Sequence, residues 1–80
     1  MYYRESVFPA THIVTENLRL RTGQNLNAET IVVLKNDTKV LVQEWGNNLT
    51  VEGKTARWAS VYTIDGLSGW CFSGYLKELK

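Results

Sequence analysis

Apolar and polar residues alternate in short runs along most of this chain, and such a pattern predicts β-strands. The run LRLR at residues 18–21 alternates strictly, which places both leucines on one face of a strand and both arginines on the other. Runs rich in β-branched and aromatic residues predict further strands at 12–15, 38–45, 58–64 and 67–72, with the turn-prone Glu16-Asn17 interrupting 12–21. No segment has an amphipathic helical stripe with caps at both ends, so we expect an all-β domain essentially without α-helix.

The segment TIVVL at residues 30–34 is apolar without alternation. Four consecutive apolar residues indicate a strand that is buried on both faces, or one that bends sharply as its sheet curls. Lys35-Asn36-Asp37 then predicts a turn, because Asn and Asp tolerate the left-handed backbone that tight hairpins require.

The connections complete this organisation. Residues 22–29 form a polar loop. We expect Gly46-Asn47-Asn48 to end the strand at 38–45 and to begin a longer hairpin-like excursion over residues 46–57, which turns again at Glu52-Gly53. Asp65-Gly66 is a tight-turn dipeptide. Five short strands suit a small closed or half-open barrel, because closure removes exposed sheet edges. We expect an N-terminal extension or linker at 1–11 and one barrel domain at 12–80.

Composition narrows the possible functions. The 80 residues support one compact core, and nine Lys and Arg nearly balance eight Asp and Glu without any charged run. A nucleic-acid partner is disfavoured, because phosphate backbones are bound by clustered positive charge. No apolar run approaches the roughly 20 residues of a membrane span, so we expect no membrane insertion. The N-terminal MYYRESVFPATH lacks the apolar block of a signal peptide.

The single cysteine, Cys71, lies between Trp70 and Phe72, and His12 is the only imidazole. A cysteine nucleophile needs a lowered pKa and a base that a third group orients. One Cys and one His also fall short of the four ligands of a structural metal site. We therefore expect Cys71 to be a small buried hydrophobe, and we expect no catalytic residue, no metal and no cofactor.

Several short motifs, taken in order, resemble the bacterial SH3 domain family over about residues 12–79. The first half resembles three motifs of the family: Leu-x-Val-Arg-x-Gly-Pro, an apolar pair, and Gly-Thr-x-Val. The matching residues are Leu18 to Gly23, then Ile31 and Leu34, then Asp37 to Val40. In the second half, the residues that match the family are Trp58, Val61, Gly66, Gly69, Trp70, Tyr75 and Leu76. Gln24 and Asp37 replace the usual Pro and Gly, and the 46–57 excursion is longer than is typical.

The resemblance implies a five-stranded SH3-like barrel with a short 3-10 turn at residues 73–75, between the last two strands. It also implies that Gly23 lies where a strand ends in a backbone conformation that a Cβ would obstruct. In this family the residues at the positions of Trp58 and Tyr75 resemble walls of a peptide groove.

The alternation of side chains along the strand predicted at 58–64 also places aromatic residues on one face of that strand. If Ala59 and Val61 line the core, then Trp58 and Tyr62 point outward. Exposed Trp and Tyr offer large, rigid contact areas and are plausible binding anchors. The alternative for these aromatic residues is that they cover the open end of the barrel against the 46–57 excursion.

The remaining candidates are Trp45, Glu29 and Arg21. Trp45 borders the long excursion and could be structural or functional, and Glu29 is the single acid of the loop at 22–30. Arg21 shares a strand face with Arg19. The guanidinium of Arg21 suits a carboxylate ligand. The favoured alternative is that Arg21 anchors the neighbouring loop through an ion pair or backbone contacts. The predicted ligand-binding set is therefore Trp58, Tyr75, Tyr62, Trp45, Glu29 and Arg21.

Two functions follow as hypotheses. The first is a non-catalytic binding module in which Trp58 and Tyr75 pack against a cell-wall peptide or a protein partner, while the loops set specificity. The second is a structural domain whose aromatic face docks on another domain of a larger envelope protein or forms a homodimer. The family resemblance alone implies a location in the cell envelope.

Overall fold

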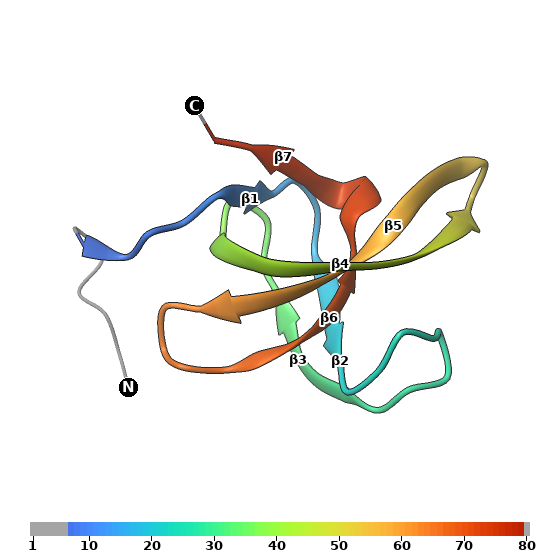
Figure 1. Ribbon diagram of the computed structural model, residues 1–80, viewed down its shortest axis with the longest axis horizontal. Coiled ribbons are helices and arrows are strands. Elements are labelled where there is room, and N and C mark those ends of the chain that lie inside the picture. The colour runs from blue at the N-terminus through green and yellow to red at the C-terminus, as the bar shows by residue number, and fades with distance from the viewer. Residues whose placement is uncertain (1–6, 80) are drawn as a thin grey trace.

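The computed structural model describes residues 7–79, which form one curled antiparallel sheet in the shape of a half-barrel (Figure 1). The sheet has the order β3-β2-β6-β5-β4-β1-β7, and within residues 7–79 there is no α-helix. The expected all-β class is confirmed, but the sheet has seven strands where five were expected. The strands are β1 (His12–Val14), β2 (Leu18–Arg21), β3 (Thr30–Leu34), β4 (Lys39–Val51), β5 (Lys54–Thr63), β6 (Ser68–Phe72) and β7 (Leu76–Glu78).

The additional strands arise at the two ends of the described chain. The interruption at Glu16-Asn17 separates β1 from β2 completely, so that the two pair with different partners. After β6 a 3-10 turn, η2 (Ser73–Tyr75), redirects the chain into β7, as expected for this turn. The short β7 then pairs antiparallel with β1, with His12 opposite Glu78. No helix in residues 7–79 is both long and apolar enough to cross a membrane.

The hairpin of β4 and β5 extends far beyond the rest of the sheet (Figure 1). The expectation that this strand ends at Gly46 is wrong. Register shifts between Val42 and Glu44, and again between Trp45 and Asn48, mark bulges that bend β4 without ending it. The turn lies at Glu52-Gly53, as expected, and both residues have positive φ (51° and 78°), which is the combination found in a type I′ hairpin turn.

The structure has the backbone conformation that was expected at Asp37 but not the one that was expected at Gly23. Asp37 has a φ of 73°, which agrees with the left-handed backbone expected after β3. Gly23 differs from its expectation, because its φ is not positive. A Cβ added there would lie 3.8 Å from Cβ of Ala28, an ordinary contact, so nothing obstructs a side chain at this position.

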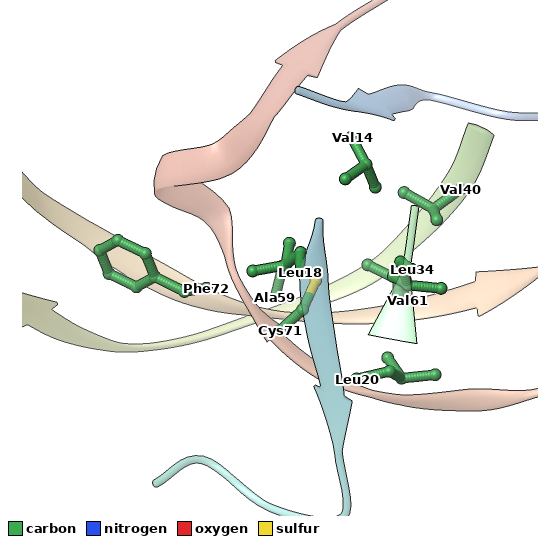
Figure 2. Packing of buried hydrophobic residues seen from close by; sticks show 9 residues of the cluster. All are labelled: Val14, Leu18, Leu20, Leu34, Val40, Ala59, Val61, Cys71 and Phe72. Atoms are coloured by element: carbon green, nitrogen blue, oxygen red, sulfur yellow. The ribbon is translucent and has the colours of Figure 1, made fainter. Parts of the chain in front are cut away.

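The core fills the concave side of the sheet (Figure 2). Ala59 and Val61 both face it and are fully buried, as the alternation predicted. Cys71 lies opposite Ala59 on β6 and is likewise fully buried. Phe72 is set apart from the other members and points away from them (Figure 2). The buried cluster comprises Val14, Leu18, Leu20, Leu34, Val40, Ala59, Val61, Cys71 and Phe72.

The apolar strand β3 is not buried on both faces, and that expectation is wrong. Only Leu34 is buried, whereas Ile31, Val32 and Val33 are exposed. The reason is topological: β3 lies at one edge of the sheet and pairs with β2 alone.

The expected extension at residues 1–11 lies partly outside the described residues, which begin at residue 7. Within the described part, the N–H of Thr11 donates to the carbonyl of Val40, and the carbonyl of Thr11 accepts from the N–H of Leu79. Thr11 is thus attached to the sheet just before β1.

Candidate functional site

A hollow of about 450 Å³ lies between β2, the outer end of the β4–β5 hairpin and η2. We call it the aromatic groove, because Trp58, Phe72 and Tyr75 line it. Charged residues stand beside these rings, with Glu16 and Arg19 on the β2 side and Glu52 on the hairpin. The other lining residues are Asn17, Leu18, Arg21, Leu26 and Val51.

The three rings form a continuous edge-to-face series. The centroids of Trp58 and Phe72 are 6.5 Å apart at 76°, and those of Phe72 and Tyr75 are 5.8 Å apart at 62°. Such T-shaped pairs are a favoured geometry for aromatic side chains. The rings come from β5, β6 and η2, so the path of the chain through the 3-10 turn brings Tyr75 against Phe72.

Trp58 is buried, with 3% of its surface exposed, so the expectation that it points out into solvent is wrong. Its side chain does leave β5 on the face opposite Ala59, but η2 packs against β5 at this end and Phe72 lies directly across from Trp58 in the neighbouring strand. The alternative, in which Trp58 helps to close one end of the barrel, describes its burial better. Trp58 still contributes to the wall of the groove.

Tyr75 is half-buried and carries the polar contacts of the groove. Its Oη donates a 3.0 Å hydrogen bond to Oε1 of Glu52, and Nζ of Lys54 lies 4.8 Å from the ring centroid. This hydrogen bond to Glu52, followed by desolvation and the charges of Glu52 and Glu16, raises the pKa of Tyr75 above its ordinary value. Tyr75 is therefore a neutral hydrogen-bond donor next to two carboxylates.

Arg21 anchors the 22–29 loop. Its Nη1 donates to the carbonyls of Leu26 and Ala28 at 2.8 and 3.1 Å. The contacts are with the loop backbone, as the favoured alternative expected. Arg19 is exposed, and its side chain has no hydrogen bond or ion pair with any residue in 7–79. The cation that the groove offers to a ligand is therefore Arg19.

The structure brings half of the predicted set to the groove, namely Trp58, Tyr75 and Arg21, and leaves the other half elsewhere. Trp45 is 42% exposed, and its ring meets His12 edge-on at 5.7 Å and lies 5.8 Å from Cζ of Arg57. Tyr62 is half-buried on β5 between Leu41 and Ser68. Glu29 is exposed before β3, and its carbonyl accepts from the N–H of Thr22.

Sequence reasoning missed several groove residues. Phe72 was regarded only as a neighbour of Cys71, and Glu16 and Glu52 were regarded as turn residues. The length of the 46–57 excursion was the available signal for Glu52, because a long hairpin carries its tip away from its own strands, and here the tip reaches Tyr75.

Cys71 has the properties of a packing residue. Burial raises the pKa of its thiol from 9.0 to about 12, so the nucleophilic thiolate is disfavoured. Nδ1 of His12 lies 2.8 Å from Oγ1 of Thr11, and its ring packs on Trp45, so neither contact involves Cys71. Residues 7–79 contain no cluster of three or more His, Cys, Asp or Glu side chains that could hold a metal ion.

Comparison of the chain with family models, with curated proteins and with solved structures finds no match.

Proposed function

We propose that this chain is a non-catalytic binding module of the bacterial SH3 type that recognises a short, extended peptide in the aromatic groove. The sequence motifs support the family, and so do the curled antiparallel sheet and the 3-10 turn before the last strand. The observation that carries the binding proposal is the convergence of Trp58, Phe72 and Tyr75 on one hollow of about 450 Å³. Pockets that combine apolar walls with a few polar groups are typical ligand sites.

The charges around the groove suggest the chemistry of the peptide. Glu16 and Glu52 line the groove together with Tyr75 and suit an amine, while Arg19 suits a carboxylate. Cell-wall stem peptides carry both groups on a short backbone, and they are the ligand that we propose. A partner protein with an extended segment of mixed charge is the alternative ligand of the same kind. The corresponding location is the cell envelope.

A second candidate function is docking onto another domain of a larger protein. It is favoured by Trp45, whose exposed ring lies outside the groove beside Arg57. Large exposed aromatic rings are common anchors at protein interfaces.

An NMR titration of the ¹⁵N-labelled chain with a soluble muropeptide tests the first candidate. We expect the indole N–H signal of Trp58 and the amide of Tyr75 to move, while the indole of Trp45, outside the groove, remains as an internal control. Arg19→Ala should weaken binding without unfolding the chain, because the side chain is exposed and has no partner within residues 7–79. Unmoved Trp58 and Tyr75 signals at millimolar ligand would rule out this ligand. Movement of Trp45 alone would mean that the muropeptide binds outside the groove, which would contradict the site that we propose.

A further inference from the structure

The side chain of Gln24 joins the 22–29 loop to the β4–β5 hairpin. Its Oε1 accepts a 2.7 Å hydrogen bond from the N–H of Asn47, which lies 23 residues further along the chain. Both partners lie where this chain departs from the bacterial SH3 pattern that it resembles, one at the replaced proline and the other in the long 46–57 excursion. The contact therefore belongs to this chain in particular.

Asn47 lies in the bulge at which the hairpin leaves the sheet. The register between β4 and β5 shifts between Trp45 and Asn48, so Gly46 and Asn47 have no partner in the ladder. Beyond the bulge, residues 48–51 pair only with residues 54–57, and we call this part, 48–57, the outer hairpin. A two-stranded ribbon is marginally stable alone, so the position of the outer hairpin depends on its contacts with other elements.

Hydrogen bonds hold this hairpin from two sides. On the side of η2, Tyr75 donates to Glu52, and Lys54 donates to the carbonyl of Gly74 at 3.2 Å. On the side of the 22–29 loop, the bond accepted by Gln24 is the only hydrogen bond within residues 7–79 that joins loop and hairpin. It lies at the base of the outer hairpin, where a small displacement becomes larger at the tip. Apolar contacts with the core cluster come from Leu49, Val51 and Ala56.

The 22–29 loop can support the hairpin because the loop is itself well fixed. Arg21 donates to two of its carbonyls, and the N–H of Thr22 donates to the carbonyl of Glu29. Gln24 lies inside this closed loop and is half-buried. Its side chain thus transmits the position of the loop to the bulge.

Gly46 provides the space that the contact requires. Its φ is not positive, so the backbone conformation does not require glycine there. A Cβ at this position would overlap the amide of Gln24, 2.6 Å from its Cδ, and would lie 2.9 Å from Cζ3 of Trp70. Glycine at position 46 is therefore explained by the close approach of these two side chains.

We propose that Gln24 is a positioning residue of the aromatic groove: it holds the base of the outer hairpin and so fixes the place of Val51 and Glu52, which line the groove. Because Glu52 is one of the two carboxylates that suit an amine, Gln24 controls the preference for a ligand with a free amine. The carboxylate end of the ligand is left to Arg19 on β2. The part that concerns the ligand rests on the proposed function, whereas the positioning of the hairpin does not.

The position of the hairpin can be measured without a ligand. Gln24→Leu keeps the bulk of the side chain but removes the acceptor, so amide exchange at Asn47 should become faster. The pKa of Tyr75 should move towards 10.0, because Glu52 is held less firmly beside it. Gln24→Glu keeps an acceptor and should restore both signals. Gln43→Leu, the same change at an exposed position of β4, is the matched control, and far-ultraviolet circular dichroism verifies that each variant is folded.

A titration with two muropeptides extends the test to the ligand. One has a free side-chain amine and the other has the same amine acetylated, and the original chain should prefer the free amine. Gln24→Leu should reduce this preference about fivefold, which corresponds to the net contribution of one hydrogen bond. In a Glu52→Gln chain, Gln24→Leu should have no further effect on the preference, because the carboxylate that it positions is gone. A residue that only stabilised the fold would not change the preference.

The inference is overturned if Gln24→Leu leaves the Asn47 exchange and the Tyr75 pKa unchanged, or if Gln43→Leu changes them equally. It is also overturned if the preference for the free amine survives in Gln24→Leu, or if the effects of Gln24→Leu and Glu52→Gln add. A folded chain that binds neither muropeptide contradicts the proposed function instead, and the measurements without ligand then decide whether Gln24 positions the hairpin.

Discussion

Tyr75 and Glu52, 23 residues apart in sequence, are joined by a 3.0 Å hydrogen bond from the phenol Oη to the carboxylate Oε1. The contact links η2 to the tip of the β4–β5 hairpin, the two elements on either side of the aromatic groove. Nζ of Lys54, beside the same hairpin tip, also donates to the carbonyl of Gly74 in η2 at 3.2 Å, so polar contacts from two neighbouring hairpin residues hold the turn against the hairpin.

Removing the charge of Glu52 should lower the pKa of Tyr75. The hydrogen bond to Glu52 is the largest cause of the raised value, and the charge of Glu52 adds to it, so Glu52→Gln should bring the pKa of Tyr75 back towards 10.0. Titration of the tyrosine Cζ signals by ¹³C NMR measures this change, with Glu44→Gln as the control. An unchanged Tyr75 titration in Glu52→Gln would show that the contact is not formed in solution.

The same shift predicts how stability depends on pH. A tyrosine whose pKa is raised by folding contributes stability that is fully present below its unfolded pKa, near 10, and that is lost as the pH rises through the folded value. We expect this part of the loss to be smaller in Glu52→Gln. Urea unfolding on both sides of pH 10 measures the difference.

The hairpin turn gives a test of backbone strain. Gly53 has a φ of 78° and nothing within 4 Å of an added Cβ, so Gly53→Ala should lower the free energy of unfolding by about 1–2 kcal/mol through conformation alone. Gly23→Ala is the matched control: its φ is not positive and its Cβ would make an ordinary contact, so stability should be unchanged or slightly higher. Chemical denaturation of both variants makes the comparison. Equal losses in the two variants would contradict the positive φ at Gly53.

Arg21 should control the order of the 22–29 loop. Arg21→Ala removes the donors to the carbonyls of Leu26 and Ala28, and hydrogen bonds from charged groups contribute about 1.5–3 kcal/mol, so we expect a loss of stability towards the lower end at this half-buried site. Amide hydrogen exchange should become faster in the loop, for example at Ala28, whose N–H donates to the carbonyl of Asn25. Arg19→Ala, two residues away on the same strand, should leave exchange in this loop unchanged. Protection that survives in Arg21→Ala would show that the loop is held by other contacts.

Cys71 should react slowly in the folded chain. Its thiol is fully buried and its pKa is raised by burial to about 12, so alkylation by iodoacetamide at neutral pH should require unfolding. Because the folded pKa lies above the unfolded one, the thiol contributes stability below pH 9 that is lost as the pH rises towards 12. Over this range the unfolding free energy of the original chain should fall relative to Cys71→Ala by up to about 1.4 kcal/mol per pH unit. Rapid labelling of the native thiol would contradict the packing that we describe.

The sequence predicted the parts of the fold that depend on local patterns. Alternation at Ala59 and Val61 identified the core face of β5, and the Glu52-Gly53 and Asp37 turns followed from backbone preferences. The count of five strands was wrong. Residues 76–78 are too few to have a periodic signal, and only the family resemblance implied a strand after the 3-10 turn; β7 exists through its pairing with β1. The continuation of β4 past Gly46 was also missed, since a bulge permits a strand to pass a glycine that otherwise suggests its end.

The site was less predictable for a related reason. Burial of Trp58 depends on η2 and on Phe72 across the sheet, and alternation within β5 reports neither. The exposure of Val32 depends on the position of β3 at the edge of the sheet, and the composition of β3 does not reveal that position. An apolar run predicts a buried strand, whether the strand that covers it comes from the same chain or from another molecule. Arg21 was interpreted correctly as a loop anchor, because the loop that it binds follows it directly in sequence.

The pairing of β1 with β7 places residues 12 and 78 side by side. A domain whose first and last strands are neighbours tolerates circular permutation and insertion into a host loop better than one whose ends are far apart. Joining these strands by a short linker and reopening the chain at the Glu52-Gly53 tip would leave every ladder of the sheet intact. Such a rearranged chain would present two free ends at the groove, where a tethered ligand could be attached.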